Sequence, residues 1–72
     1  MRPKLTRAEL AYIEGKWRVI LSVAGDAPDI ICWCANKDHA LHVVSVYLEA
    51  QYRRLPKKPN YYKPEKIIYY FR

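Results

Sequence analysis

Long apolar runs and cysteine pairs suited to cross-linking are both missing from this 72-residue sequence. The longest apolar run, residues 30–35, has six residues, whereas a membrane-spanning helix needs about 20. No apolar segment follows the basic residues near Met1, so no secretion signal is expected. Cys32 and Cys34 are too close to staple the fold, and nothing argues for an oxidising compartment. These absences predict a soluble, cytoplasmic protein that does not associate with a membrane.

Glycine is scarce as well, and its scarcity excludes one class of site. With only Gly15 and Gly25, the chain has no glycine-rich loop of the kind that cradles phosphate groups. No pair of carboxylates stands out as an acid–base couple, and a chain this short has little material for a pocket that buries a substrate. We therefore expect a non-enzymatic protein that takes no cofactor and no small-molecule substrate.

The residue types that bind zinc are present, but at unsuitable spacing. Cys32, Cys34, His39 and His42 are four possible ligands. Residues i and i+2 of a strand lie about 6.6 Å apart, which is too wide for two thiolates on one tetrahedral ion. The cysteines are interpreted as small buried hydrophobic residues and the histidines as helix-surface residues, so no metal is expected. Asp38, beside them, is interpreted as a residue that caps a helix rather than as a catalytic acid.

Charge is abundant and unevenly distributed. There are 13 lysines and arginines against 7 aspartates and glutamates, for a formal net charge of +6. Residues 1–18 have five bases and two acids, residues 19–50 have one base and four acids, and residues 51–72 have seven bases and one acid. Basic ends around an acidic middle favour an anionic partner, either nucleic acid or an acidic protein face. The alternative is that the lysines only keep a small protein soluble.

The first element is predicted as a short helix over residues 7–14. Thr6 is placed as its N-cap, with Glu9 reaching back in a capping box and a leucine on each side forming a hydrophobic staple. Gly15 is interpreted as the residue that ends the helix. Because a helix this short is unstable alone, it is expected to pack on the rest of the chain.

A β-hairpin is predicted over residues 16–35. Apolar residues recur at every second position from Trp17 to Val23, which is the period of a strand with one buried face. Residues 25–29 are rich in turn formers, and a β-favouring run follows them. The two runs are therefore expected to pair antiparallel.

The main helix is predicted over residues 38–55, with Asn36 or Asp38 as its cap. One face of this helix is apolar at helical spacing and is expected to cover the sheet. Its residues are Leu41, Val44, Leu48, Tyr52 and Leu55. A second apolar strip consists of Val43, Val46 and Ala50. This strip either packs on the first helix or stays exposed as a docking surface.

The remaining residues complete a single small domain over residues 1–72. Three prolines exclude helix from residues 56–65 and favour a stiff, extended connection. Residues 66–71 are predicted as a final strand. The expected fold class is α+β, in the order αββαβ, with a three-stranded, mostly antiparallel sheet and the long helix packed on one face.

The strongest functional signal lies in residues 52–64, where cations alternate with tyrosines on this stiff backbone. Such a mixture binds single-stranded nucleic acid, and it also forms contact residues at protein interfaces. The predicted contact residues of this arm are Arg53, Arg54, Lys57, Lys58, Tyr61, Tyr62 and Lys63. A secondary basic patch is predicted from Arg2, Lys4 and Arg7. The alternative is that some tyrosines are core residues and the lysines are only solvated.

In size, charge and lack of catalytic apparatus, the whole chain resembles the very small phage-encoded proteins that bind a host machine. Some members of that class dock on host RNA polymerase and redirect transcription. The resemblance implies a protein that occupies a polymerase surface, hinders initiation-factor engagement and alters termination.

The sequence therefore predicts a protein-binding regulator of a nucleic-acid machine, with RNA polymerase as the first candidate partner. Direct binding of single-stranded RNA or DNA is the alternative, through the same residues. A third alternative is an anti-defence protein that blocks a host nuclease complex.

Overall fold

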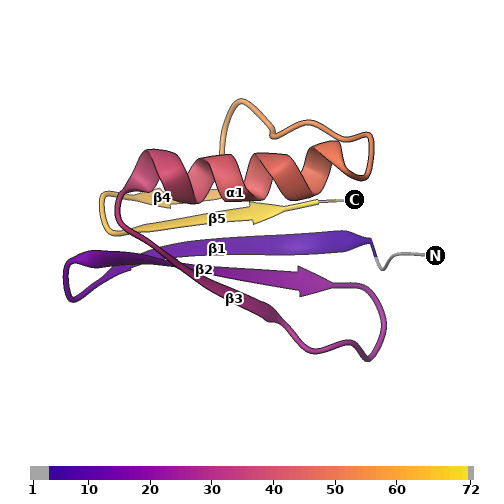
Figure 1. Ribbon diagram of the computed structural model, residues 1–72. Coiled ribbons are helices and arrows are strands. Elements are labelled where there is room, and N and C mark those ends of the chain that lie inside the picture. Colours follow the sequence, from indigo (N-terminus) through magenta and orange to yellow (C-terminus); the bar gives the residue numbers. More distant parts are fainter. Residues whose placement is uncertain (1–3, 72) are drawn as a thin grey trace.

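The computed structural model describes residues 4–71, which form five strands and one helix around a single core (Figure 1). The strands are β1 (Leu5–Ile13), β2 (Lys16–Val23), β3 (Ile30–Cys34), β4 (Tyr61–Lys63) and β5 (Lys66–Tyr70), and the helix is α1 (Lys37–Glu49). The sheet has the order β3-β2-β1-β5-β4, and every neighbouring pair is antiparallel. The predicted α+β class, with an antiparallel sheet and the long helix packed on one face, is confirmed. The predicted order αββαβ is wrong, because the elements run βββαββ and include one helix rather than two. The predicted number of strands is wrong, because the sheet has five strands rather than three.

The predicted helix over residues 7–14 is wrong, because this segment is β1, the central strand. It pairs with β2 along one edge and with β5 along the other. Ala8 and Leu10 point into the core, whereas Arg7 and Glu9 lie on the opposite face, which is the alternation of a strand. Two flanking ladders satisfy backbone groups that a two-turn helix would leave mostly unpaired at its ends.

The residues interpreted as a helix end form a hairpin turn instead. Ile13 and Lys16 are paired in register, so Glu14 and Gly15 are the only residues of the loop between β1 and β2. Both have positive φ, 50° for Glu14 and 82° for Gly15. Positive φ at both loop residues is the geometry that joins two twisted strands with least distortion. Gly15 is therefore needed for the hairpin rather than for a helix C-terminus.

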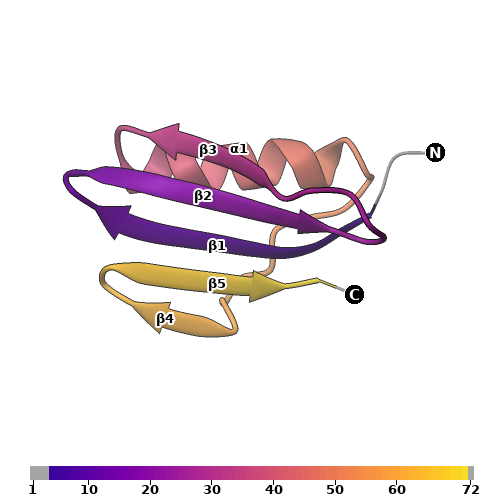
Figure 2. The ribbon, with the colours of Figure 1, turned by 90° about the horizontal axis from the view of Figure 1, so that it is seen from below.

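α1 covers one face of the sheet over β1, β2 and β3, while β5 and β4 extend beyond it (Figures 1 and 2). Its N-cap is Asn36, one of the two predicted caps, whose side chain accepts a hydrogen bond from the backbone N–H of His39 at 2.8 Å. The helix buries Ala40, Val44 and Leu48 completely. They pack on core residues of the strands, which are Leu5, Ala8, Leu10, Trp17, Val19, Leu21, Cys34, Ile67 and Tyr69.

The helix ends six residues before the predicted position. Its C-cap is Ala50, and the chain then turns through Tyr52 in the left-handed region at φ 56°. The backbone N–H of Arg53 donates to the Leu48 carbonyl at 2.8 Å, which closes the helix end. Tyr52, predicted to lie on the buried face, is completely exposed. Leu55 still packs against the core, but from the segment that follows the helix.

The proline-containing connection over residues 56–65 includes a strand that the sequence analysis did not predict. β4 pairs with β5 from Tyr61 to Lys63, and a two-residue turn at Pro64 and Glu65 joins the two strands. All three prolines of this connection, Pro56, Pro59 and Pro64, lie outside β4, in agreement with the rule that proline avoids ladder positions. Within residues 4–71, no helix is long and apolar enough to span a membrane.

Truncation of the core helix tests the observed helix phase. Leu48→Ala removes a side chain that is fully buried beneath α1, so we expect the free energy of unfolding to fall by about 2–5 kcal/mol. Val46→Ala removes a side chain that is 47% exposed on the same helix and should cost less than about 1 kcal/mol. Urea unfolding followed by circular dichroism measures both variants. Equal losses in the two variants would contradict the phase.

Candidate functional site

The sheet face opposite α1 is not covered by any described element, and we call it the open face (Figure 2). Antiparallel partners that lie directly opposite each other point to the same face, so the strand register gives its membership. Its residues are Arg7, Glu9, Ala11, Ile13, Lys16, Arg18, Ile20, Ser22, Ile31, Trp33, Tyr61, Lys63, Lys66, Ile68 and Tyr70. The five cations and one carboxylate in this set give the open face a formal charge of +4.

The register arranges these side chains in rows across the strands. One row is mainly cationic, and its members from β3 to β4 are Trp33, Arg18, Ala11, Lys66 and Lys63. The next row is mainly apolar, with Ile31, Ile20, Glu9, Ile68 and Tyr61. A third row contains Ser22, Arg7 and Tyr70. The open face thus presents cations on both sides of an apolar strip.

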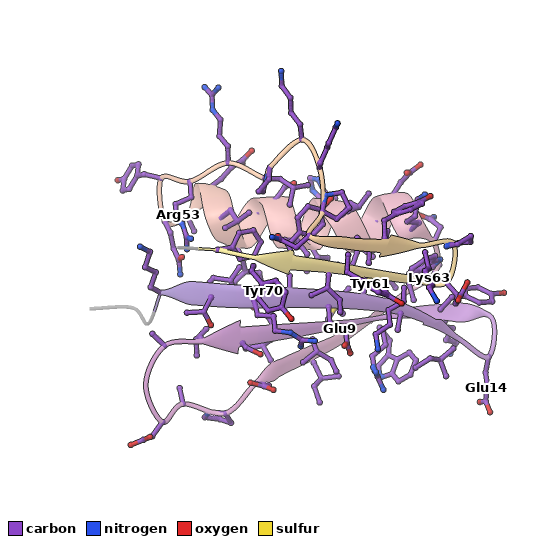
Figure 3. The ribbon with its side chains drawn as sticks, turned by 180° about the vertical axis from the view of Figure 1, so that it is seen from behind. Glu9, Glu14, Arg53, Tyr61, Lys63 and Tyr70 are labelled. Carbon is purple, nitrogen blue, oxygen red and sulfur yellow. The ribbon has the colours of Figure 1, made fainter. Side chains whose placement is uncertain are left out.

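Glu9 lies on the open face (Figure 3), where its carboxylate pairs with three of the five cations. Its Oε1 accepts from Arg7 Nη2 at 2.9 Å, its Oε2 accepts from Arg18 Nη2 at 3.3 Å, and Lys66 Nζ lies 3.6 Å from Oε1. The carboxylate side chain is only 11% exposed, while the cations remain about a third to a half exposed. Glu9 therefore fixes the positions of cations that still face solvent.

The protonation of Glu9 follows from two opposing effects. Burial alone raises the pKa of the Glu9 carboxyl, because it disfavours the charged form. The hydrogen bond from Arg7 and the positive charges of Lys66, Arg7 and Arg18 lower it by more, so the pKa of Glu9 lies below its usual value. Glu9 is consequently ionised at neutral pH and remains an anchor for the surrounding cations.

Three large aromatic side chains are exposed on the open face. Tyr70 is 55% exposed, Trp33 is 52% exposed and Tyr61 is 39% exposed. The Arg7 guanidinium carbon lies 5.8 Å from the centre of the Tyr70 ring, and Lys63 Nζ lies 6.0 Å from the centre of the Tyr61 ring. Cations at this distance from ring faces are attracted by them. The exposed rings and cations are therefore neighbours on one surface.

The predicted arm over residues 52–64 is not one common surface. Arg53 is tied to the body of the protein, since its Nη1 donates to the Leu5 carbonyl at 2.7 Å and its guanidinium carbon lies 5.4 Å from the centre of the Phe71 ring (Figure 3). Arg53 therefore has a structural role beside the end of α1. Tyr61 and Lys63 belong to the open face, whereas Tyr62 points to the side of α1, where Lys37 Nζ lies 5.9 Å from the centre of its ring.

The other predicted contact residues are also divided between locations. Arg54, Lys57 and Lys58 are exposed in the segment between α1 and β4. Lys4 is exposed immediately before β1, and Arg7 is on the open face beside Glu9. Arg2 lies outside the described residues. The structure thus unites only Arg7, Tyr61 and Lys63 from the predicted set on one surface.

Sequence reasoning missed most of the open face. The two-residue period over residues 16–23 left Lys16 and Arg18 on the face opposite the buried one, but neither was proposed as a contact residue. Lys66, Trp33 and Tyr70 were not proposed as contact residues either. Pairing β1 with both β2 and β5 would have been needed to place the other residues beside them.

The remaining candidate chemistry is sparse. Within the described part of the chain, no three His, Cys, Asp or Glu residues lie together as a metal site would require, and both cysteines are free thiols.

One apolar pocket of about 400 Å³ lies between the loop from β2 to β3 and the end of α1, although the chain was expected to be too short for a pocket that buries a substrate. Its lining residues are Leu5, Val23, Ala27, Pro28, Ile30, Tyr47, Ala50 and Gln51.

Comparison with known proteins adds no assignment: no family model, curated protein or solved structure matches this chain. The geometry of the open face therefore carries the functional argument.

Neutralising the central carboxylate should make the protein less stable and change its response to pH. Because folding lowers the pKa of Glu9, the stabilisation by its carboxylate is present at neutral pH and is lost as pH falls below about 4. We expect Glu9→Gln to reduce the free energy of unfolding by about 1–2 kcal/mol near pH 7, the modest value reflecting partly exposed partners.

The difference between Glu9→Gln and the unaltered protein should shrink as the pH is lowered toward about 3. Urea unfolding at several pH values measures it. Glu65→Gln, at an exposed carboxylate in the turn between β4 and β5, is the matched control and should change stability little at any pH. A difference for Glu9→Gln that does not vary with pH would contradict the role of the ionised carboxylate.

Proposed function

We propose that the protein binds single-stranded nucleic acid through the open face of its sheet. The observation that carries the proposal is the arrangement of five cations and three exposed aromatic rings on one surface, in register across five strands. Proteins that bind single strands combine these two elements, because cations meet the phosphates while rings stack on the bases. Binding without a chemical step would make the protein non-enzymatic.

The open face, with its exposed rings, suits a single strand better than a duplex. Unpaired bases can spread on a sheet face and stack on Tyr70, Tyr61 and Trp33, whereas the bases of a duplex are already stacked on one another. A helix that enters the major groove usually carries basic residues toward the phosphates. α1 has one lysine, Lys37, against Asp38 and Glu49, and its last turn has no basic residue. The helix is therefore a poor element for reading a duplex.

Glu9 contributes to this function by organising the cations before a ligand arrives. Arg7, Arg18 and Lys66 converge on one buried carboxylate rather than sampling many rotamers. Because side-chain freedom is already reduced, less conformational entropy is lost when phosphates bind. Lys16 and Lys63 are not paired with Glu9 and are exposed, so they are the open-face cations best placed to meet phosphates directly.

A protein surface on a nucleic-acid machine, such as RNA polymerase, is the second candidate partner. The observation that favours it is the apolar row of the open face, in which Ile31 is 61% exposed and Ile20 is half-buried. Exposed apolar side chains near tryptophan, tyrosine and arginine are typical of protein interfaces. The two candidates differ in the effect of salt, which weakens nucleic-acid binding steeply.

The charge prediction compares two pairs of lysines. Binding of a labelled oligothymidine of about 10 nucleotides, measured by fluorescence anisotropy, should be micromolar or tighter at about 0.1 M salt. The double variant with Lys16→Gln and Lys63→Gln should reduce the slope of log K against log salt by about 1.4, since each phosphate contact with a single strand contributes about 0.7.

The double variant with Lys57→Gln and Lys58→Gln is the matched control, because it removes the same charge from the segment between α1 and β4. We expect its salt slope to be nearly unchanged. If this control loses as much affinity as the open-face pair, contact by the arm is supported instead of contact by the open face. If the unaltered protein binds no oligonucleotide even at about 50 mM salt, the nucleic-acid proposal is wrong and a protein partner becomes the better hypothesis.

The ring prediction compares two exposed tyrosines. Tyr70→Ala removes a ring from the open face. We expect affinity for the same oligonucleotide to fall about tenfold, because one base can no longer stack on an aromatic ring. Tyr52→Ala removes a ring that is completely exposed but lies beyond the end of α1, and affinity should stay within about twofold. Anisotropy titrations at one salt concentration measure both. Equal losses would show that the rings do not act through the open face.

A further inference from the structure

β3 is an edge strand that lacks the features by which natural sheets avoid edge-to-edge pairing. Its five residues, Ile30–Cys34, include no charge and no proline, and its register with β2 is continuous. Natural edge strands are usually short, charged, bulged or covered. The other edge strand, β4, is only three residues long, contains Lys63 and is followed by Pro64. The two edges of the sheet are therefore unequal, and only β3 offers a regular uncharged edge.

The side chains of β3 on the open face are also unusually exposed. Ile31 is 61% exposed and Trp33 is 52% exposed, although an isoleucine and a tryptophan are among the side chains that gain most from burial. Above β3, the near flank of α1 is apolar as well. Tyr47 of α1 and Ile30 of β3 line the same apolar pocket, so Tyr47 lies on the flank of α1 nearest to β3. Val43 lies one turn before Tyr47 on the same flank. Apolar groups thus border the β3 edge on both sides of the sheet.

We propose that a second copy of this chain pairs with the β3 edge, antiparallel, about a two-fold axis through Cys32. Side chains of directly opposed residues must point to the same face, which restricts the possible registers. Among these, the register centred on Cys32 pairs all five residues, whereas a shift by one allowed step pairs only three. In this register Ile31 lies opposite the partner's Trp33, and Ile30 lies opposite the partner's Cys34. Pairs of aromatic and β-branched side chains are favourable across strands.

Charge also favours a second copy at this edge. The whole chain has a net charge of +6, so two copies repel each other over most of their surfaces. From Ile30 to Glu49 the only base is Lys37, and the acids are Asp38 and Glu49, which gives this segment a net charge of −1. β3 itself is uncharged. β3 therefore brings no cation of its own to the contact, and Arg18, opposite Trp33, lies one strand away on β2.

The predicted dimer has one continuous sheet. Because the two-fold axis is perpendicular to the sheet, both helices lie on one side and both open faces lie on the other. The dimer does not depend on the nucleic-acid proposal, and neither test in that proposal alters β3. The two hypotheses can therefore fail separately.

Analytical ultracentrifugation of the whole chain under reducing conditions tests the dimer. We expect a species of twice the chain mass to appear as concentration rises to about 0.5 mM. Ile31→Lys places a charge on the proposed contact and should weaken the dimer at least tenfold. Tyr62→Lys, at a ring that is 58% exposed on β4, is the matched control and should leave the dimer unchanged. Circular dichroism confirms that both variants are folded.

Thiol cross-linking gives a second readout that does not depend on a variant at Ile31. Cys32 lies opposite the partner's Cys32 in the proposed register, so a mild oxidant should trap a dimer in the unaltered protein and in Cys34→Ser. The same treatment of Cys32→Ser should trap none. The proposal is overturned if the chain stays monomeric up to about 0.5 mM, which is the result expected if a different protein pairs with the β3 edge. It is also overturned if Tyr62→Lys disrupts the dimer and Ile31→Lys leaves the dimer intact.

Discussion

β1 is hydrogen-bonded along both of its edges, to β2 on one side and to β5 on the other, and the rest of the structure depends on this double pairing. It places residues from the two ends of the chain side by side. On one face it centres Ala8 and Leu10 beneath the helix layer. On the other face it centres Glu9 among cations contributed by three strands. One strand thereby organises both the core and the open face.

The single helix accounts for the contrast between the two faces. α1 has 13 residues and lies over β1, β2 and β3, where it buries one apolar stripe. No other described element lies against the opposite face, so the residues there meet solvent unless they pair with one another. Glu9 can be nearly buried on this face only because three cations satisfy its charge. The polar network replaces the second layer that a larger protein would use to cover such a sheet.

The elements with local signals were predictable, and those that depend on distant pairing were not. The two-residue period of β2 and the helical period of Val44 and Leu48 are visible within short windows. The residues before Gly15 carry a capping-box pattern, yet they form a strand because two ladders outweigh local preference. Tyr52 fitted the helical period but follows the helix end in a left-handed conformation. β4 is paired locally with β5, but it was missed because three residues between Pro59 and Pro64 are too few to show a strand period.

The site was predicted less well than the fold for the same reason. Tyr61, Lys63 and Arg7 were identified from composition, but their common surface arises only when β4, β5 and β1 are adjacent. Arg53 was predicted as a contact residue because it lies among cations and tyrosines in the sequence. In the structure its guanidinium instead donates to the Leu5 carbonyl. A run of cations and tyrosines in sequence therefore does not show which of them share a surface. The register of the strands does.

The order of the strands also bears on how the chain folds. β1, β2 and β3 are joined by local turns, and the two-residue loop at Glu14 and Gly15 brings the first pair together at little entropic cost. The ladder between β1 and β5 instead joins residues near opposite ends of the sequence, and it requires closure of a loop that contains nearly the whole chain. Folding speed is limited by such non-local contacts. During synthesis, the partly assembled β1–β3 sheet would expose the free edge of β1 until β5 leaves the ribosome.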